Sequence, residues 1–231
     1  MKLQVTLDTP TIRECRELVE LIHEYVDIVE VGNPIIIESG LKLVRELREE
    51  YPDLEICADA KIVNSGHYIA SRCFEAGADI VTIMGVTSDQ TIAGAVAAAK
   101  LSGGKIMADL TGVSDIAIRC LELEDLGVDY LCGHTSFEDA NITNNPLSDL
   151  NPRVQRVIQL VRGYENNPLR ELDLIRSCIT GRAKPAIVGR ISEENIAEVV
   201  AHEPEIVLVG RAIVGSVTPA HAAADLKEYI V

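Results

Sequence analysis

Short apolar runs, rich in β-branched residues, recur along the chain, and most are continuous rather than alternating in polarity. Strands of a parallel sheet have this pattern, because helices cover the sheet and bury both faces of each strand. The pattern predicts eight strands, at residues 3–7, 26–31, 54–62, 79–84, 105–110, 128–132, 183–188 and 205–209.

Between these runs, apolar residues return every three or four positions, which indicates helices with one buried face. The segments 75–79 and 125–129 repeat one arrangement, in which a glycine ends a helix just before the next strand begins. The predicted helices are residues 11–25, 37–50, 66–76, 90–101, 116–126, 152–161, 193–201 and 219–229.

Eight alternating strand and helix units predict a closed (β/α)8 TIM barrel of the α/β class rather than an open sheet. The dinucleotide-binding pattern G-x-G-x-x-G is absent, and no Pro-, Gly- or Ser-rich linker divides the 231 residues. We therefore predict one domain, residues 1–231. The stretch 136–181 is longer than one loop and one helix require. We interpret it as an insertion after the sixth strand, followed by one helix or two.

The chain carries a formal net charge of −15 and has no cluster of Lys and Arg. This composition argues against binding to nucleic acid, which needs clustered cations. It leaves an anionic ligand open, because backbone amides can hold a phosphate without net positive charge.

No apolar stretch approaches the roughly 18 to 20 residues of a membrane span, and the chain begins without an apolar signal segment. The six cysteines include no C-x-x-C pair, so we expect reduced, buried thiols and a cytoplasmic protein.

Charged or titratable residues stand at the C-terminal ends of five of the predicted strands. In a (β/α)8 barrel these ends meet at the face that carries the active site. A single such residue is often a helix cap, and Asp8 could be one. Burial of a charge is costly unless the charge is paired or metal-bound, so we interpret the recurrence as a site. Its members are Asp8, Glu30, Asp59, Lys61, Asp109 and His134.

The densest of these segments is 58–64. Asp59 and Lys61 project to the same side of a strand, because side chains alternate with a period of two, and Asn64 follows in the loop. The pair is either a structural ion pair or a lysine placed to stabilise an oxyanion. Glu30 and Asp59, from adjacent strands, could hold Mg²⁺, since oxygen ligands suit this ion. His134 is either a general acid or base or a rim residue.

Glycines follow the last two strands, as Gly189 before Arg190 and Gly210 before Arg211. The loops after strands seven and eight commonly form a phosphate site in these barrels. Glycine lets backbone N–H groups approach an anion, and Arg211 could add a charge-assisted hydrogen bond. We therefore predict a phosphorylated ligand.

Taken together, these motifs resemble the orotidine 5′-phosphate decarboxylase suprafamily. Within it, the chain is most similar to the group of 3-hexulose-6-phosphate synthases and 3-keto-L-gulonate-6-phosphate decarboxylases. The resemblance spans nearly the whole chain outside 136–181. It is carried by residues 7–8, 29–32, 58–61, 75–79, 134–135 and 209–213.

The resemblance implies a role for each candidate residue. It assigns Glu30 and Asp59 to Mg²⁺, Lys61 to an enediolate intermediate, and Asp8 to the hydroxyl groups of the substrate. It places Asp109 in the site and the glycines with Arg211 at the phosphate. It also implies a homodimer with the site near the subunit interface.

Two departures from the family pattern accompany this resemblance. Asn64 stands where the family has a second Asp, and Arg190 replaces the second of two glycines.

Phe137, three residues after His134, occupies a position that is aromatic in the synthases and Arg in the decarboxylases. The expected function is therefore a Mg²⁺-dependent lyase that adds ribulose 5-phosphate to formaldehyde. A decarboxylase of a β-keto sugar-acid phosphate and a non-catalytic sugar-phosphate-binding barrel remain alternatives.

Overall fold

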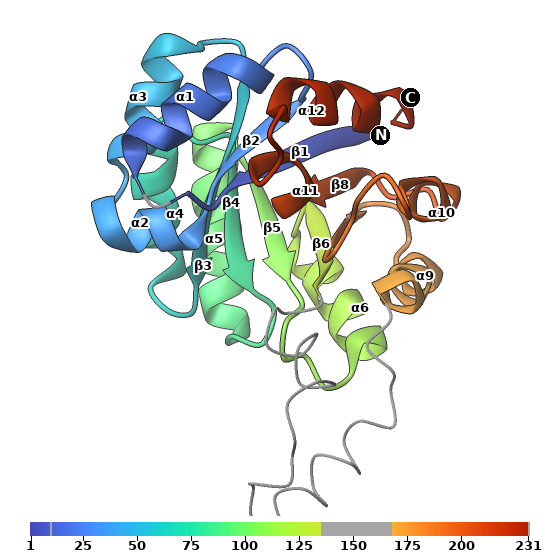
Figure 1. The fold of residues 1–231 in the computed structure, drawn as a ribbon. Coiled ribbons are helices and arrows are strands. Elements are labelled where there is room, and N and C mark those ends of the chain that lie inside the picture. The colour runs from blue at the N-terminus through green and yellow to red at the C-terminus, as the bar shows by residue number, and fades with distance from the viewer. Residues whose placement is uncertain (10, 135–167, 231) are drawn as a thin grey trace, which may run out of the picture.

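Eight parallel strands close into a barrel in chain order, which confirms the predicted (β/α)8 TIM barrel (Figure 1). The computed structural model describes residues 1–9, 11–134 and 168–230. The strands are β1 (Lys2–Leu7), β2 (Ile28–Val31), β3 (Glu55–Ile62), β4 (Ile80–Met84), β5 (Lys105–Asp109), β6 (Tyr130–His134), β7 (Lys184–Val188) and β8 (Ile206–Val209).

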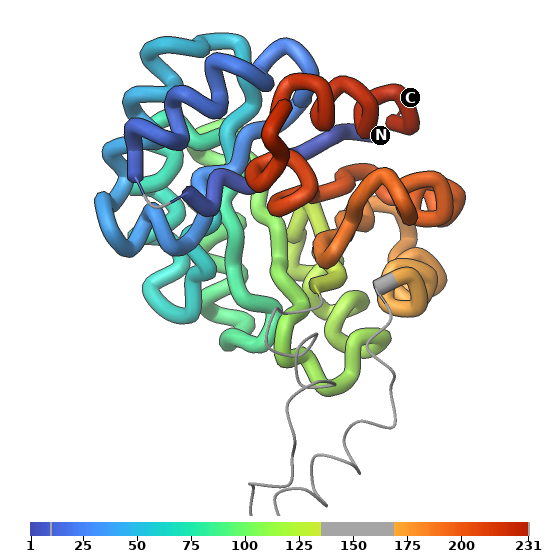
Figure 2. The backbone as a smooth tube through the Cα atoms, viewed as in Figure 1, coloured from blue at the N-terminus to red at the C-terminus, as the bar shows by residue number. Residues whose placement is uncertain are grey.

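Helices surround the barrel, and the two chain ends lie near each other (Figure 2). None of the helices in the described part of the chain is long and apolar enough to cross a membrane. The described helices are α1 (Ile12–Ile22), α2 (Asn33–Ser39), α3 (Lys42–Glu50), α4 (Gly66–Glu75), α5 (Asp89–Ser102), α6 (Ile116–Leu126), α9 (Pro168–Cys178), α10 (Ile196–Ala201), α11 (Arg211–Val214) and α12 (Pro219–Glu228).

The helix predicted over 37–50 is wrong in extent, because two helices occupy 33–50. The first helix, α2, starts with a proline near its N-terminus and ends at Gly40, whose φ of 60° breaks the helical path. The short helix α11 was also not predicted. The helix predicted at 152–161 and most of the predicted insertion lie outside the described residues, and α9 falls within the last part of that stretch.

The start of α1 corrects one interpretation of Asp8. Thr11 is the N-cap, and its side chain accepts a hydrogen bond from the backbone N–H of Glu14 at 3.2 Å. Asp8 therefore does not cap this helix.

The two repeated segments at 75–79 and 125–129 have the same structure. Gly77 and Gly127 end their helices with φ values of 104° and 93°, a region that favours glycine. The carboxylates of Asp79 and Asp129 then accept hydrogen bonds, at 2.7 and 2.8 Å, from backbone amides of the preceding strands, β3 and β5. These contacts lie at the N-terminal ends of the strands, where (β/α)8 barrels carry stabilising features.

The barrel interior changes from apolar to polar along the strands. The part nearer the N-terminal ends of the strands is filled by one cluster of buried side chains, mostly apolar: Ile28, Cys57, Ile80, Met107, Tyr130, Cys132, Ala186, Ile206 and Leu208. Buried polar side chains follow toward the C-terminal ends, from β1 to β5: Thr6, Glu30, Asp59, Thr82 and Asp109. An apolar layer therefore closes the barrel beneath the polar side chains of the site.

Candidate active site at the barrel mouth

Lys61 is the centre of the polar cluster. Its ammonium nitrogen lies 2.6 Å from Asp109 Oδ2 and 3.4 Å from Asp59 Oδ1. Burial opposes the charge on Lys61, but the two carboxylates outweigh this effect and raise its pKa above the usual value. An ammonium has three donors and two carboxylates face it, so one donor remains for a ligand oxygen.

A break in the ladder between β3 and β4 places Lys61. The strands pair at Ala58–Val81 and next at Ile62–Ile83, so residues 59–61 lie opposite Thr82 alone. Lys61 has a φ of 42°, in the left-handed region. Bulges of this kind are frequent beside active sites, where they redirect a side chain. The predicted proximity of Asp59 and Lys61 is therefore right, but a bulge produces it together with strand alternation.

Sequence reasoning missed two residues that hold Asp59. The Thr82 hydroxyl donates to Asp59 Oδ1 at 2.7 Å and accepts the backbone N–H of Lys61 at 2.9 Å. The backbone N–H of Asn33, at the start of α2, donates to Asp59 Oδ2 at 3.3 Å. An isolated threonine in an apolar run is common in strands, so the sequence offers no sign of this role.

Asp109 joins Lys61 to His134. Its Oδ2 lies 2.8 Å from His134 Nδ1, and its Oδ1 accepts the backbone N–H of Thr111 at 2.8 Å. Burial opposes ionisation of Asp109, but the hydrogen bond from His134 and the charge of Lys61 lower its pKa well below the usual value. The contact also orients the ring, so that Nε2 is left for another partner.

Glu30 lies beside this group with 5% of its surface exposed. Gln4 donates to its Oε2, and the Thr6 hydroxyl donates to its Oε1 at 3.2 Å. Burial, and then the negative charge of Asp59, raise the pKa of Glu30 above its usual value. Two buried carboxylates thus share a site that a cation would stabilise.

Asp8 reaches the mouth from the end of β1. It keeps an exposed edge, yet burial of its carboxyl group and the charge of Asp59 raise its pKa. Its Oδ1 lies directly over Gly32, where an added Cβ would stand 2.2 Å away. Glycine at position 32 therefore leaves the space that this carboxylate occupies.

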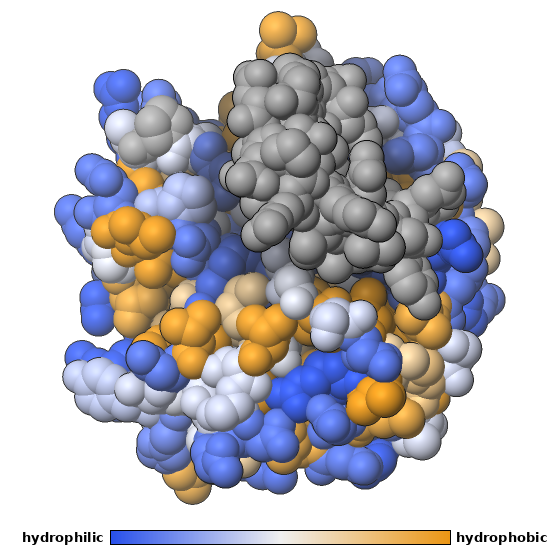
Figure 3. All heavy atoms as spheres, turned by 90° about the horizontal axis from the view of Figure 1, so that it is seen from below, coloured by the Kyte–Doolittle hydropathy of each residue, from blue (hydrophilic) through white to orange (hydrophobic). Residues whose placement is uncertain are grey.

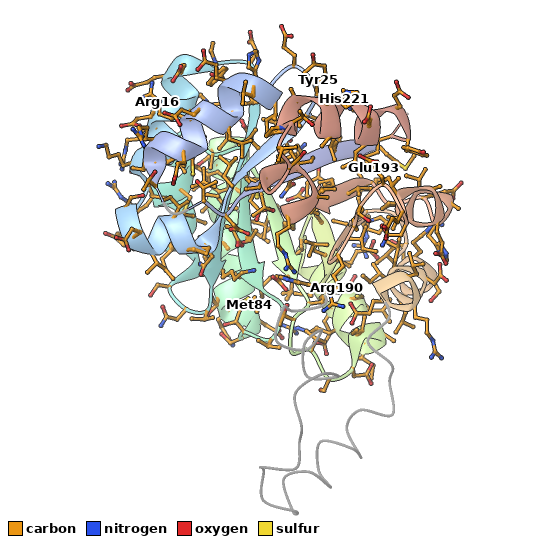
Figure 4. The ribbon with its side chains drawn as sticks, viewed as in Figure 1. Arg16, Tyr25, Met84, Arg190, Glu193 and His221 are labelled. Carbon is orange, nitrogen blue, oxygen red and sulfur yellow. The ribbon has the colours of Figure 1, made fainter. Side chains whose placement is uncertain are left out.

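The glycines after β7 and β8 lie at the same end of the barrel. Gly189 has a φ of 130° and Arg190 a φ of 52°. The Asn195 side chain holds this turn, because its amide donates to the Arg190 carbonyl at 3.1 Å and its Oδ1 accepts from Ser192 N–H at 2.9 Å. A Cβ added to Gly210 would point into open space. Figure 4 shows Arg190 and Met84, the last residue of β4, at this lower end.

Two predicted positions lie at the surface of the protein. Asn64 is exposed in the loop between β3 and α4, and Arg211 is the exposed first residue of α11. Phe137, on which the distinction between synthase and decarboxylase depended, lies outside the described residues. Within residues 1–9, 11–134 and 168–230, no group of three or more His, Cys, Asp or Glu side chains is arranged to hold a metal ion.

Comparison with known proteins gives the family. The model of the orotidine 5′-phosphate decarboxylase / HUMPS family matches residues 1–226. The chain belongs to this family. A curated relative, the 3-hexulose-6-phosphate synthase of Bacillus subtilis strain 168, is 37% identical over 100% of this chain and 99% of its own length.

Solved structures agree with this placement. A crystal structure of a 3-hexulose-6-phosphate synthase has a TM-score of 0.84 and 31% identity, with 100% of both chains covered. The structure of KGPDC from Streptococcus mutans shares the fold with a TM-score of 0.80 and 22% identity, over 99% of this chain and 96% of its own. The family and group predicted from the motifs are therefore confirmed.

Proposed function

We propose that this chain is a 3-hexulose-6-phosphate synthase, an aldehyde-lyase that joins ribulose 5-phosphate to formaldehyde. The observation that carries the proposal is the Asp59–Lys61–Asp109–His134 cluster, in a chain 31–37% identical over its full length to curated relatives of that name. These relatives bear out the prediction from the sequence.

The reaction needs a base, a group that stabilises an oxyanion, and an acid. His134 Nε2, with Asp109 fixing the ring, removes a proton from C1 of the ketose and forms an enediolate. The free donor of Lys61 binds the enediolate oxygen, which carries the new charge. C1 then attacks the formaldehyde carbon, and the ketose carbonyl forms again. His134 gives the proton to the oxygen of the former formaldehyde, which becomes a hydroxyl group. The new carbon becomes C1 of the product, so the carbonyl carbon that was C2 is numbered C3, as the name 3-hexulose requires.

The carboxylates of Glu30 and Asp59 fit a divalent cation. Both are buried, burial and the charge of Asp59 raise the pKa of Glu30, and the oxygens of the two carboxylates suit Mg²⁺. A bound Mg²⁺ would supply Lewis-acid stabilisation of the substrate oxygens. Gln4, Thr6 and Thr82 would keep the two carboxylates oriented, and Asp8 would contact the hydroxyl groups of the sugar.

We place the phosphate group at the loops after β7 and β8. Gly189 has a φ of 130°, which favours glycine, and a Cβ on Gly210 would meet no atom within 4 Å, so a phosphate could approach the backbone here. Arg190 and Arg211 add positive charge at this edge of the mouth. The unpaired state of all six cysteines, five of them buried, supports the predicted cytoplasmic location.

The first test measures formaldehyde consumption with ribulose 5-phosphate, in Mg²⁺ and in excess chelator. Lys61→Ala should reduce turnover by about a hundredfold to a thousandfold, because removal of one oxyanion-binding donor costs about 10²–10³ in kcat. Lys105→Ala is the matched control, since Lys105 is also paired with a carboxylate on a barrel strand but lies at the opposite end. Equal activity in Lys61→Ala and wild type would refute the proposal.

The same assay separates the alternatives. Release of CO₂ from a β-keto sugar-acid phosphate, without use of formaldehyde, would indicate the decarboxylase. Absence of both reactions in a folded protein that binds ribulose 5-phosphate would indicate a binding barrel. In that case Asn64→Asp, which restores the carboxylate of the family pattern, should produce a large gain of activity.

We also propose a homodimer that uses the mouth side of β2 to β4. Hydrophobic side chains gather in a band on the face seen in Figure 3. Ile37, Val63, Tyr68 and Val86 are large apolar or aromatic residues that follow the ends of these strands and are at least 54% exposed. Several large, exposed apolar side chains on one face are typical of a protein–protein interface.

Sedimentation velocity tests this interface. Val63→Asp should convert the dimer to a monomer, because it buries a charge in an apolar contact. Leu101→Asp is the control, since Leu101 is equally apolar and 81% exposed but lies at the far end of α5. A monomeric wild-type protein, or a dimer unchanged by Val63→Asp, would contradict the proposal.

A further inference from the structure

The hydroxyl group of Thr82 joins the two residues that the proposed reaction depends on most. It donates to Asp59 Oδ1 at 2.7 Å and accepts the backbone N–H of Lys61 at 2.9 Å. The side chain is 4% exposed and lies inside the barrel, between the apolar floor and the mouth. A hydroxyl can donate one hydrogen bond and accept another at the same time, so a single atom serves both neighbours.

The position of Thr82 explains why this bond matters. Between the pairs Ala58–Val81 and Ile62–Ile83, it is the only residue of β4 opposite three residues of β3. The regular ladder is therefore interrupted there, and the Lys61 amide receives its acceptor from a side chain instead of a backbone carbonyl. The Lys61 backbone itself is strained, with a φ of 42°, and such conformations persist only when their surroundings hold them.

We propose that Thr82 is a positioning residue that fixes the bulge at Lys61 and the carboxylate of Asp59 in one arrangement. It does not touch the substrate in this scheme. It acts by directing the Lys61 ammonium to the space between Asp59 and Asp109, with one donor left for the enediolate. The inference rests on the proposed function for its kinetic consequence, but its structural part stands on the two hydrogen bonds alone.

Three variants isolate the hydroxyl. Thr82→Val keeps the shape and loses both hydrogen bonds, whereas Thr82→Ser keeps both bonds and loses one methyl group. Thr87→Val is the matched control, because Thr87 lies in the loop after β4 and its hydroxyl bonds the Val63 carbonyl rather than Asp59 or the Lys61 amide. Circular dichroism and the unfolding midpoint establish that each variant is folded.

In steady-state kinetics, Thr82→Val should lower kcat about ten- to a hundredfold, since small misplacements of reacting groups cost up to about a hundredfold. KM for ribulose 5-phosphate should stay within about threefold, because the phosphate edge of the site lies on β7 and β8. Thr82→Ser and Thr87→Val should retain near-wild-type kcat. A folded Thr82→Val enzyme with wild-type kcat, or equal losses in the Ser and Val variants, would overturn the proposal.

Amide hydrogen exchange at Lys61 provides a readout that needs no activity. Without its acceptor, the Lys61 N–H in Thr82→Val should exchange at least about tenfold faster than in Thr82→Ser. If the wild-type protein proves inactive as a synthase, this difference still supports the positioning role while the proposed function fails. Unchanged protection of the Lys61 amide in Thr82→Val would reject the positioning role whatever the enzyme does.

Discussion

Glu124 should be the residue on which the unfolding free energy depends most strongly outside the apolar core. It lies on α6, with 2% of its surface exposed, and its carboxylate faces the segment between α9 and β7. Its oxygens accept the backbone N–H groups of Thr180, Arg182 and Ala183 at 2.8–3.1 Å, and the Thr180 hydroxyl at 2.9 Å. One side chain thus satisfies four donors of a connecting segment.

The magnitude follows from the fate of these donors in Glu124→Ala. The Ala183 amide belongs to a fully buried residue, and leaving it unpaired costs about 1–3 kcal/mol. Thr180 and Arg182 are exposed, so their three donors regain water and lose only about 0.5–1.5 kcal/mol each. The sum is about 2.5–7.5 kcal/mol. At about 2–4 °C per kcal/mol for a domain of this size, the midpoint should fall by at least about 5 °C.

Thermal and urea unfolding followed by circular dichroism measure this loss. Asp125→Ala is the control, because Asp125 is adjacent on α6 and also pairs with Arg182, at 2.7 Å, but is exposed. It should cost no more than about 1 kcal/mol. Synthase activity at low temperature should be unchanged in both variants, since the contacts of Glu124 with residues 180–183 lie at the N-terminal end of the barrel. A Glu124→Ala protein no less stable than Asp125→Ala would refute the reasoning.

Three further predictions follow from other contacts. Hydrogen bonds from backbone amides outweigh burial and lower the pKa of Glu124 from 4.5, so its stabilisation is present above that pH and is lost as pH falls through the folded pKa; the difference in midpoint between wild type and Glu124→Gln should shrink between pH 6 and pH 3. Gly32→Ala should leave the midpoint almost unchanged but raise KM for ribulose 5-phosphate, because the new Cβ displaces the Asp8 carboxylate. In thiol titration of the native protein, Cys178 alone should react quickly, since the other five cysteines are buried; rapid reaction of several thiols would contradict this.

The strand pattern of this chain was predictable because each strand is buried on both faces. Eight continuous apolar runs correspond to the eight strands, with differences of one or two residues at their ends. The helices were less certain where local breakers compete with periodicity. Gly40 interrupts a stretch whose apolar spacing still suits one helix, and its positive φ decides the outcome.

The polar strand ends were predictable for a different reason. Asp59, Lys61, Asp109 and His134 are charged or titratable groups in runs that are otherwise apolar, and the parallel topology brings such ends to one face. Their mutual contacts confirm that the residues belong together. Their individual roles stay predictions that the variants described above test.

Buried hydrogen-bonding residues away from the polar strand ends escaped the same reasoning, because the type of residue does not show that it is buried. Thr82 resembles any β-branched strand residue, and Gln4 resembles an outward-facing position of β1 until the barrel closes around it. Glu124 resembles a surface residue of α6, and its partners lie 56–59 positions away. These contacts exist only after the chain has closed, so they depend on tertiary packing rather than on local pattern.

The distribution of these residues also separates stability from catalysis within one fold. Glu124, Asp79 and Asp129 bond backbone amides at the N-terminal ends of strands, where a change costs unfolding free energy. Thr82 and Gln4 bond carboxylates at the other end, where a change misplaces charge. Because an apolar layer lies between the two sets, substitutions at opposite ends should be additive in stability. Thr82→Val should therefore alter kcat equally in the wild-type and Asp125→Ala backgrounds.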